Sequence, residues 1–409
     1  MINKITKVTC CRLCASPNLV EVVNLGHQAL TGVFPSNKDC DITAGPLQVG
    51  WCRECNLLQL MHRYPPEEMY GENYGYRSGL NNLMINHLTD KVDWLRSITD
   101  LSDNEAVLDI GSNDGTLLKS YGDAAFHRVG IDPTGLKFAG FYEDSIELIP
   151  DFFSSTNVSN RKFKIITSIS MFYDLDDPKS FVSDIKNVLH QEGIWHFEQS
   201  YMPSMIRQNS YDTICHEHIE YYSLTPVATL LQKSGLKILD VKMNAVNGGS
   251  FAVTACHEDG NSSTKCSILD WLLEREKKSG YCTPSPFRDF EKNIFEHRES
   301  LIDLVQKINE QGKTIHVYGA STKGNVLLQF CGFTEEDIPF AAEINPDKFG
   351  HITPGSNIPI ISDEESKLMK PDYYLVLPWH FREGIIRKEK DFLSSGGNLI
   401  FPLPEIEVI

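Results

Sequence analysis

The stretch "AVLDIGSNDGTLLKSY", residues 106–121, decides the fold of the chain. Its apolar start predicts a buried strand, its centre a glycine turn, and its end the beginning of a helix. Gly111 and Gly115 would let the backbone of the turn approach a ligand closely. This order of elements is typical of the first unit of a nucleoside-binding α/β sheet.

The chain after this helix continues the pattern. "HRVGIDPT", residues 127–134, predicts a second strand that ends at Asp132. A carboxylate in that position can accept hydrogen bonds from both ribose hydroxyls of a nucleoside. "FKIITSIS", residues 163–170, and "EGIWHFEQSY", residues 192–201, predict later strands of the same sheet. The sequence therefore predicts a Rossmann-like domain.

The glycine loop differs from the dinucleotide fingerprint G-x-G-x-x-G. It reads D-x-G-x-x-D-G, with Asp109 before the loop and Asn113 and Asp114 within it. Carboxylates would repel a pyrophosphate, but they suit the cationic sulfonium and the α-amino group of S-adenosylmethionine. The loop thus favours a methyltransferase over a dehydrogenase. The alternative is an acidic turn in an unrelated α/β domain.

Two further loops are predicted to complete the cofactor site, one near the adenine and one near the methionine part. These residues are Asp151, Phe152 and Phe153 in the first loop and Ser170 and Met171 in the second. The segment "MYGENYGYRSGLNNLMINHL", residues 69–88, precedes the sheet. Its Tyr74 and Tyr76 either cover the cofactor or pack between domains, and the sequence favours neither reading.

Two C-x-x-C pairs near the N-terminus predict a metal site. Cys11 and Cys14 form the first pair, and Cys52 and Cys55 form the second. Four thiolates fill the tetrahedral shell of one zinc ion and leave no open position, so the predicted zinc is structural. A redox pair is the rival reading. Cys10 could also replace Cys11 in another register.

The composition of the chain excludes several classes of protein. The chain has 409 residues, 41% of them hydrophobic, and a formal net charge of −17, which argues against nucleic acid as a partner. No run approaches the roughly 18 apolar residues of a membrane span, and the N-terminus does not resemble a signal peptide. We expect a cytoplasmic protein, and a monomer by default.

The C-terminal third predicts a second Rossmann-like domain. An amphipathic helix is expected over residues 285–312, followed by a strand, a glycine turn and a helix in "KTIHVYGASTKGNVLLQFCG", residues 313–332. Backbone N–H groups, Ser321, Thr322 and Lys323 in this turn suit phosphate. A turn without a ligand is the alternative. The predicted domains are 1–68 for zinc, 69–284 for the cofactor and 285–409 for the substrate.

The stretch "DTICHEHIEYYS", residues 212–223, gathers groups that bind or release protons. It could bind a metal, transfer a proton, or form a packed structural loop. The spacing of His216 and His218, with no further ligand nearby in the sequence, makes a metal the weakest of the three.

Together these motifs resemble the nucleotide-sugar C-methyltransferases, which methylate a keto-deoxysugar carried on a nucleoside diphosphate. The resemblance spans nearly the whole chain. It rests on "CRLC…CRECNLLQL", "LDIGSNDG…GIDPT", "YDTICHEHIEYYS" and "YGASTKGNVLLQFCG…KFGHITPGSNIPI…LPWHF". It implies S-adenosylmethionine and structural zinc as cofactors, and a C-terminal domain that contributes to sugar-nucleotide binding.

The resemblance also implies roles for individual residues. His218 would be the base that removes the α-proton of the ketone, with Glu217 in contact with the substrate and His216 orienting the loop. Tyr76 matches a tyrosine of the family's active-site region. The expected substrate-binding residues are Cys215, Tyr222, Ser321, Lys323, Asn325 and Glu343.

Three positions depart from the family pattern and leave the acceptor open. Cys215 stands where tyrosine is frequent, Tyr173 and Asp174 where histidine is frequent, and His380 where the pattern has asparagine. Methylation of oxygen on a related sugar is therefore an alternative. An NAD-dependent sugar-nucleotide oxidoreductase or epimerase, and a cofactor-sensing protein without catalysis, are alternatives of other classes.

Overall fold

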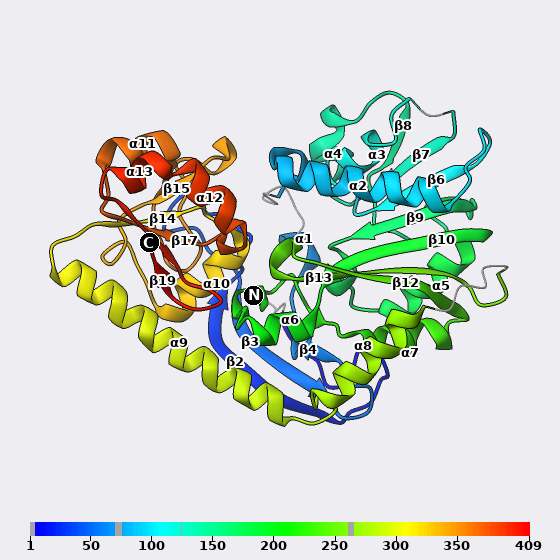
Figure 1. Ribbon diagram of the computed structural model, residues 1–409, viewed down its shortest axis with the longest axis horizontal. Coiled ribbons are helices and arrows are strands. Elements are labelled where there is room, and N and C mark those ends of the chain that lie inside the picture. Colours follow the sequence, from blue (N-terminus) through cyan, green and yellow to red (C-terminus); the bar gives the residue numbers. More distant parts are fainter. Residues whose placement is uncertain (1–4, 70–75, 124, 261–265) are drawn as a thin grey trace.

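The computed structural model describes residues 5–69, 76–123, 125–260 and 266–409, so Tyr74 lies outside the described residues. In Figure 1 the C-terminal elements form one lobe and the predicted cofactor sheet forms the other. Long N-terminal strands run between the two lobes (Figure 1). The predicted α/β class, with two Rossmann-like sheets, is confirmed.

The cofactor sheet has seven strands in the order β12-β13-β10-β9-β6-β7-β8. All neighbours from β10 to β8 pair in parallel, and β13 is antiparallel to β10. The strand order reverses between β6 and β9, and ligands bind beyond such a switch point. The strands are β6 (Ala106–Ile110), β7 (His127–Ile131), β8 (Ile146–Ile149), β9 (Phe163–Ile169), β10 (Leu189–Ser200), β12 (Leu236–Asn244) and β13 (Ser250–His257).

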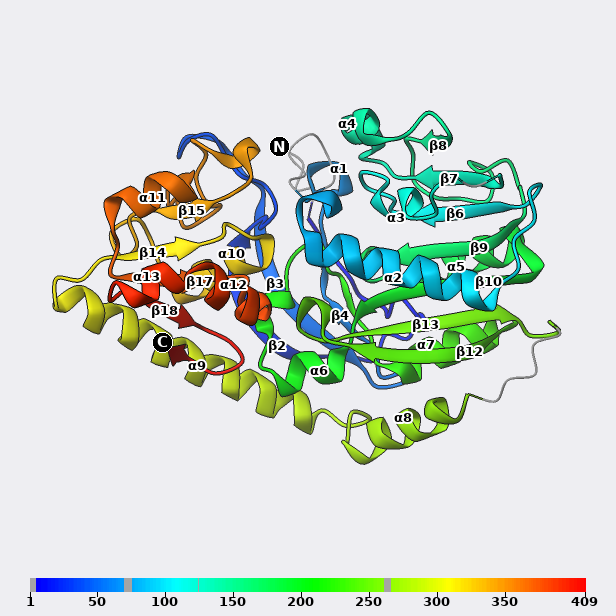
Figure 2. The ribbon, with the colours of Figure 1, turned by 45° about the horizontal axis from the view of Figure 1, so that its top comes forward.

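Helices cover this sheet, which explains why its central strands are buried nearly throughout. Figure 2 shows α2 crossing one face of the sheet. Helix α5 begins where Asp177 accepts a hydrogen bond from the N–H of Ser180, with Pro178 at the first helical position. The helices are α2 (Asn82–Ile98), α3 (Thr116–Lys119), α4 (Gly135–Phe138), α5 (Pro178–Val188), α7 (Leu224–Lys233) and α8 (Ser267–Lys278).

The N-terminal module is built on an antiparallel sheet of order β11-β4-β3-β2. Its edge strand β11 (Glu220–Tyr221) begins two residues after His218. The N–H of Leu60 also donates to the carbonyl of Ile219 at 2.8 Å. The other elements are β1 (Thr6–Lys7), β2 (Leu19–Ala29), β3 (Ala44–Cys52), β4 (Leu58–Leu60), β5 (His62–Arg63) and α1 (Pro66–Met69).

The C-terminal sheet has the order β16-β15-β14-β17-β18-β19, with β14 first in sequence and central in space. This is the strand order 3-2-1-4-5-6 of the Rossmann fold. Its strands are β14 (Ile315–Tyr318), β15 (Ala341–Glu343), β16 (Ile360–Ser362), β17 (Tyr373–Val376), β18 (Asn398–Phe401) and β19 (Glu407–Val408). Its helices are α10 (Thr322–Cys331), α11 (Asp363–Met369), α12 (Arg382–Lys388) and α13 (Lys390–Ser394).

Helix α9 (Ser285–Glu310) confirms the predicted amphipathic helix, and it packs against both β2 of the N-terminal module and β14 of the C-terminal sheet. It runs along β2 in both views (Figures 1 and 2), and its Glu291 accepts a hydrogen bond from the N–H of Asn24 at 3.2 Å. One apolar core contains Val49 of β3, Phe290 of α9 and Val317 of β14. The two predicted domain boundaries stay a prediction, but the pairing of β11 with β4 crosses the first of them and the shared apolar core crosses both.

Within the described ranges, no helix is both long and apolar enough to cross a membrane.

Candidate active site

The glycine loop of the cofactor sheet turns between β6 and α3. Gly111 and Gly115 both have a φ of +72°, and a Cβ at Gly111 would lie 3.1 Å from Cγ of Met171. Asp132, directly after β7, accepts the backbone N–H of Asn113 at 2.8 Å. Lone pairs remain on its carboxylate for ribose hydroxyls. The loop, Asp132 and Met171 therefore lie together at the carboxyl end of the sheet, where a nucleoside fits.

The carboxylate of Asp114 has partners within the chain. Its Oδ2 accepts the N–H of Gly79 at 3.0 Å and lies 3.6 Å from Nε of Arg77. Its Oδ1 accepts the hydroxyl of Thr116 at 2.5 Å. Arg77 already offsets part of the negative charge, so the predicted attraction between Asp114 and a cationic cofactor stays a prediction.

Asp109 and Asn113 also bind parts of the chain around the loop. Asp109 lies within β6 and accepts the hydroxyl of Thr167 at 2.6 Å, and burial raises its pKa to about 7. Asn113 accepts the N–H of Ser78 at 2.9 Å and donates to the carbonyl of Tyr76 at 3.2 Å. The side chain of Tyr76 is 48% exposed. Residues 76–79 are thus hydrogen-bonded across the glycine loop.

The two further segments predicted to contact the cofactor, residues 151–153 and 170–171, also lie at strand ends. Phe152, after β8, is 54% exposed, whereas Phe153 packs edge-on against an aromatic ring of α5. Asp151 accepts the N–H of Phe152 at 2.7 Å. Ser170, after β9, has a φ of +56° and precedes Met171 above Gly111. The structure therefore brings Ser170 and Met171 to the glycine loop.

The backbone holds His218 in one tautomer. Its Nδ1 lies 3.0 Å from the carbonyl oxygen of Thr213, which can only accept, so Nδ1 carries the proton and Nε2 keeps its lone pair. The half-buried ring lies edge-on to Tyr173, with 4.5 Å between centroids. Burial, and then the charge of Lys323, lower the pKa of His218 to about 3. The ring is therefore a neutral proton acceptor at physiological pH.

The other members of this loop contact different parts of the protein. The ring of His216 is buried edge-on against Tyr64 of the N-terminal module, 4.6 Å between centroids, and Cys215 is completely buried. Tyr222 is buried and donates its hydroxyl to Glu220 at 2.7 Å. In the described part of the chain, the two histidines belong to no cluster with metal-site geometry.

Glu217 is the point where three parts of the chain meet. Its carboxylate is buried and accepts the hydroxyl of Thr31, in the N-terminal module, at 3.1 Å. A Cβ at Gly32 would collide with this carboxylate and would lie 3.7 Å from Thr322 of α10. Asn325 of α10 donates to the carbonyl of Thr31 at 2.8 Å. Burial raises the pKa of Glu217.

The turn before α10 faces the same junction. Ser321 is the N-cap of α10 and accepts the N–H of Gly324 at 3.0 Å. Nζ of Lys323 donates to the carbonyl of Asn247 at 3.3 Å, in the segment between β12 and β13. Lys323 thus extends from the C-terminal domain towards the cofactor domain.

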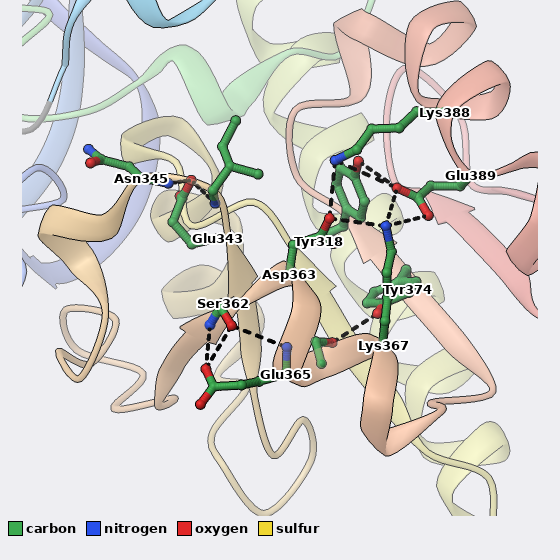
Figure 3. A network of polar contacts seen from close by, with 12 residues as sticks. Tyr318, Glu343, Asn345, Ser362, Asp363, Glu365, Lys367, Tyr374, Lys388 and Glu389 are labelled. Carbon is green, nitrogen blue, oxygen red and sulfur yellow. Dashed lines mark hydrogen bonds and ion pairs between the residues drawn. The ribbon is translucent and has the colours of Figure 1, made fainter.

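Glu343, at the end of β15, turns its carboxylate back onto the backbone (Figure 3). It accepts the N–H groups of Ala320 at 3.1 Å, Ile344 at 2.7 Å and Asn345 at 3.1 Å. Lys348 lies 3.6 Å away and donates to the carbonyl of Ala320. Like Asp132 in the first sheet, Glu343 joins the end of the second strand to the loop after the first.

Two cavities border these residues. One, of about 10 Å³, is large enough for roughly one water molecule. It is lined by Tyr173, Ser200, Met202, Met205, Thr213, His218, Glu220 and Tyr221. The second, of about 190 Å³, lies between the two lobes and is lined by Arg77, Leu80, Lys137, Phe138, Phe141, Asn345 and Asp347.

The structure adds residues that the sequence did not single out. Tyr221, rather than Tyr222, lines the small cavity with His218. Asp212 is buried and accepts Nε1–H of Trp379 at 2.8 Å. Its place at the start of the quoted loop was a usable signal, since a buried carboxylate needs a partner. Thr31 carried no signal, because nothing local to residue 31 indicates that it contacts Glu217.

The four N-terminal cysteines form a site that fits zinc. Their sulfur atoms all lie within 4.8 Å of one another, and Cys11–Cys55 and Cys14–Cys52 are both 3.5 Å apart. Sulfurs about 2.3 Å from a tetrahedral zinc would be about 3.8 Å apart, so small shifts admit the ion. No protein donor beyond the four thiols is needed, and the site fits a structural role.

Both cysteine pairs have the same local turn. The residue after each pair, Ala15 or Asn56, has a φ near +60°, at +60° and +63°. The N–H of that residue donates to the carbonyl of the first cysteine of its pair, at 2.8 Å for Ala15 and 2.9 Å for Asn56. Such turns aim two thiols of one short segment at the same point.

The buried state of His216 predicts a pH dependence of stability. Burial lowers its pKa to about 3, below the ordinary value near 6.5, so the folded state binds fewer protons than the unfolded state between these values. Stability contributed by neutral His216 is full above pH 6.5 and is lost as pH falls. At pH 5 the loss is about 2 kcal/mol for this one ring.

We expect the stability of His216→Gln, measured as the urea concentration at the midpoint of unfolding, to fall less between pH 7.5 and pH 5 than the stability of the unchanged chain. His127→Gln, at an exposed position, is the matched control and should keep the full pH dependence. Equal pH dependence in all three proteins would contradict the prediction.

Three family models match the chain in order: the zinc binding domain at residues 11–70, the methyltransferase domain at residues 84–241, and the C-methyltransferase C-terminal domain at residues 245–404. The C-methyltransferase NovU of Streptomyces niveus is 32% identical over 407 residues. This alignment covers 98% of the present chain and 96% of NovU.

Solved structures match a smaller part. Mitomycin 7-O-methyltransferase MmcR has 15% identity and a TM-score of 0.34, over 44% of this chain and 55% of its own. Plantazolicin methyltransferase BpumL, solved with SAH, has 13% identity and a TM-score of 0.34, over 42% of this chain and 82% of its own.

Proposed function

The chain belongs to the C-methyltransferase family, and from this premise we propose that it methylates a carbon atom of a keto-deoxysugar linked to a nucleoside diphosphate. The chain is an S-adenosylmethionine-dependent methyltransferase with a structural zinc site. S-adenosylmethionine supplies an electrophilic methyl group on a positively charged sulfur.

The observation that carries the proposal is the state of His218. Carbon methylation next to a ketone requires a base for the α-proton, and His218 presents a neutral Nε2 whose partner Nδ1–H is fixed by Thr213. The proton would move from the α-carbon to Nε2. Glu217, fixed by Thr31, would contact the substrate from the same loop.

Two observations support a nucleoside diphosphate as the carrier. The C-terminal sheet has Rossmann strand order, with its glycine turn and α10 next to Glu217. The larger cavity combines the rings of Phe138 and Phe141 with the cations Arg77 and Lys137. Aromatic rings suit a base and cations suit phosphates.

The reaction needs no disulfide, and the cysteines agree with a reducing compartment. All eleven cysteines lie in the described part of the chain, where none is in a disulfide and four form the zinc site. This supports the proposed cytoplasmic location.

Transfer of a deuterated methyl group tests the function. The protein is incubated with labelled S-adenosylmethionine and with nucleoside-diphosphate ketosugars made by dehydratases, and products are analysed by mass spectrometry and NMR. We expect a labelled product with the methyl group on carbon. A label on oxygen would reject the enolate chemistry and establish the alternative O-methyltransferase, and no label on any ketosugar would reject the proposed substrate class.

A further inference from the structure

Lys323 lies at the start of α10, and its charge partly offsets the rise that burial causes in the pKa of Asp212. No carboxylate oxygen of the described residues is within 4.0 Å of its ammonium group, whose hydrogen-bond partner is the carbonyl of Asn247. It is the second residue of α10, whose N-terminus adds partial positive charge. A cation in this setting has capacity for a negatively charged ligand atom.

The position of Lys323 relative to His218 follows from independent contacts. Gly32 lies between Glu217 and Thr322 of α10, so close to both that an added Cβ would touch both side chains. Next to burial, the charge of Lys323 is the second cause that lowers the pKa of His218, and it also lowers the pKa of His380. Helix α10 also packs against Tyr211–Thr213, and the carbonyl of Thr213 accepts a hydrogen bond from Nδ1 of His218. The start of α10 therefore lies beside the loop that carries His218.

His218 alone does not explain enolate formation. A base with a lowered pKa has little driving force for taking a proton from carbon. The reaction then requires strong stabilisation of the charge that develops on the ketone oxygen. A cation that lowers the basicity of His218 can still favour the step if it lies closer to the ketone oxygen than to the imidazolium, because the attraction is then larger than the repulsion.

We propose that Lys323 is a catalytic residue that donates a hydrogen bond to the ketone oxygen of the substrate and stabilises the enolate formed when His218 removes the α-proton. This inference rests on the proposed function. In the step, the α-C–H bond breaks, its proton goes to Nε2 of His218, its electron pair forms the C=C bond, and the carbonyl π pair moves to oxygen. When carbon then attacks the methyl group of S-adenosylmethionine, the C=O bond re-forms, the S–CH₃ bond breaks, and Lys323 keeps its proton.

This role differs from binding phosphate, which the glycine turn alone would suggest. A phosphate ligand would act on substrate affinity, whereas an enolate-stabilising group acts on the rate at saturation. The two roles can be separated without methyl transfer.

The test is hydrogen–deuterium exchange at the α-carbon in D₂O, followed by proton NMR without S-adenosylmethionine. The probe is a dehydratase-made nucleoside-diphosphate 4-keto-6-deoxyglucose, and the uncatalysed rate is subtracted. We expect Lys323→Met to lower the saturated exchange rate about 10²–10³-fold. Lys323→Arg, which keeps the charge, should retain more of the rate, and the Kd of the probe should change less than the exchange rate.

Lys179→Met is the matched control, because Lys179 is likewise the second residue of a helix, α5, but is exposed. It should exchange at the unchanged rate. Unchanged zinc content and S-adenosylhomocysteine affinity would show that Lys323→Met is folded. A weaker affinity for the probe with an unchanged saturated rate would overturn the inference and make Lys323 a phosphate ligand. The proposed function itself has a separate test. It would be overturned if the unchanged chain gave no exchange and the labelling experiment showed the same ketosugar to be methylated on oxygen or not at all.

Discussion

His218→Gln is expected to lose methyl transfer about 10²–10⁴-fold, the range that a general base contributes. Glutamine can keep a hydrogen bond to the carbonyl of Thr213, but it has no basic nitrogen to replace Nε2. The loss should appear in kcat, because the step that fails is proton removal after binding. Affinity for S-adenosylhomocysteine should change little, since Asp132 bonds to the glycine loop at Asn113, whereas His218 bonds to Thr213 in another part of the chain.

The measurements are single-turnover methyl transfer, α-hydrogen exchange and calorimetric binding. His127→Gln, at an exposed position at the start of β7, is the control and should keep full activity. The unchanged enzyme should show no loss of exchange near pH 6.5 attributable to His218, since its pKa of about 3 keeps Nε2 unprotonated above pH 5. Retained turnover in His218→Gln would mean that another group is the base.

Loss of zinc is expected to abolish activity as well as order in the N-terminal module. Structural zinc contributes on the order of 10 kcal/mol to small cysteine modules, so Cys52→Ser should leave the two turns without their common anchor. The effect should reach the loop that carries His218, because Arg12, between Cys11 and Cys14, donates at 3.3 Å to Asp176, in the same loop as Tyr173, whose ring contacts His218. Strand β11, which begins two residues after His218, also pairs with β4 of the module.

Zinc content by elemental mass spectrometry, methyl transfer and amide hydrogen exchange check this result. Cys282→Ser is the control, since Cys282 is an exposed free thiol outside the cluster. It should keep one zinc ion per chain and full activity. If Cys52→Ser lost its zinc but kept both the order of residues 5–69 and its activity, the structural role of the site would be wrong.

The sequence predicted correctly those features that depend on residues close together in the chain. The strand and turn at residues 106–115, the cysteine pairs and helix α9 each depend on spacings within one short segment, so the sequence was sufficient. The placement of Asp132 after a strand also followed from a short pattern. None of these features depends on a contact with a residue that is distant in the sequence.

The parts of the site that were missed depend on distant partners. Thr31 and Glu217 are 186 positions apart, and Arg12 and Asp176 are 164 apart, so no spacing rule connects them. The partners of Asp114 show the same limit: its charge was evident, but Arg77 as its neighbour was not. Which of Tyr221 and Tyr222 lines the small cavity likewise depended on how β11 pairs with β4, because one step along a strand reverses the face.

The pairing of β11 with β4 has a consequence for synthesis of the chain. Domains generally fold as the ribosome releases them, N-terminal first. Here the sheet that begins at Leu19 receives its last strand only when Tyr221 has emerged, and Gln329 of α10 bonds to Ala29 later still. The edge of β4 therefore stays unpaired through about two-fifths of translation, a period when such edges are prone to pair with other chains. Ribosome-bound chains ending before residue 220 should be more susceptible to aggregation than chains that include β11, and the cell's chaperones would meet this protein at that stage.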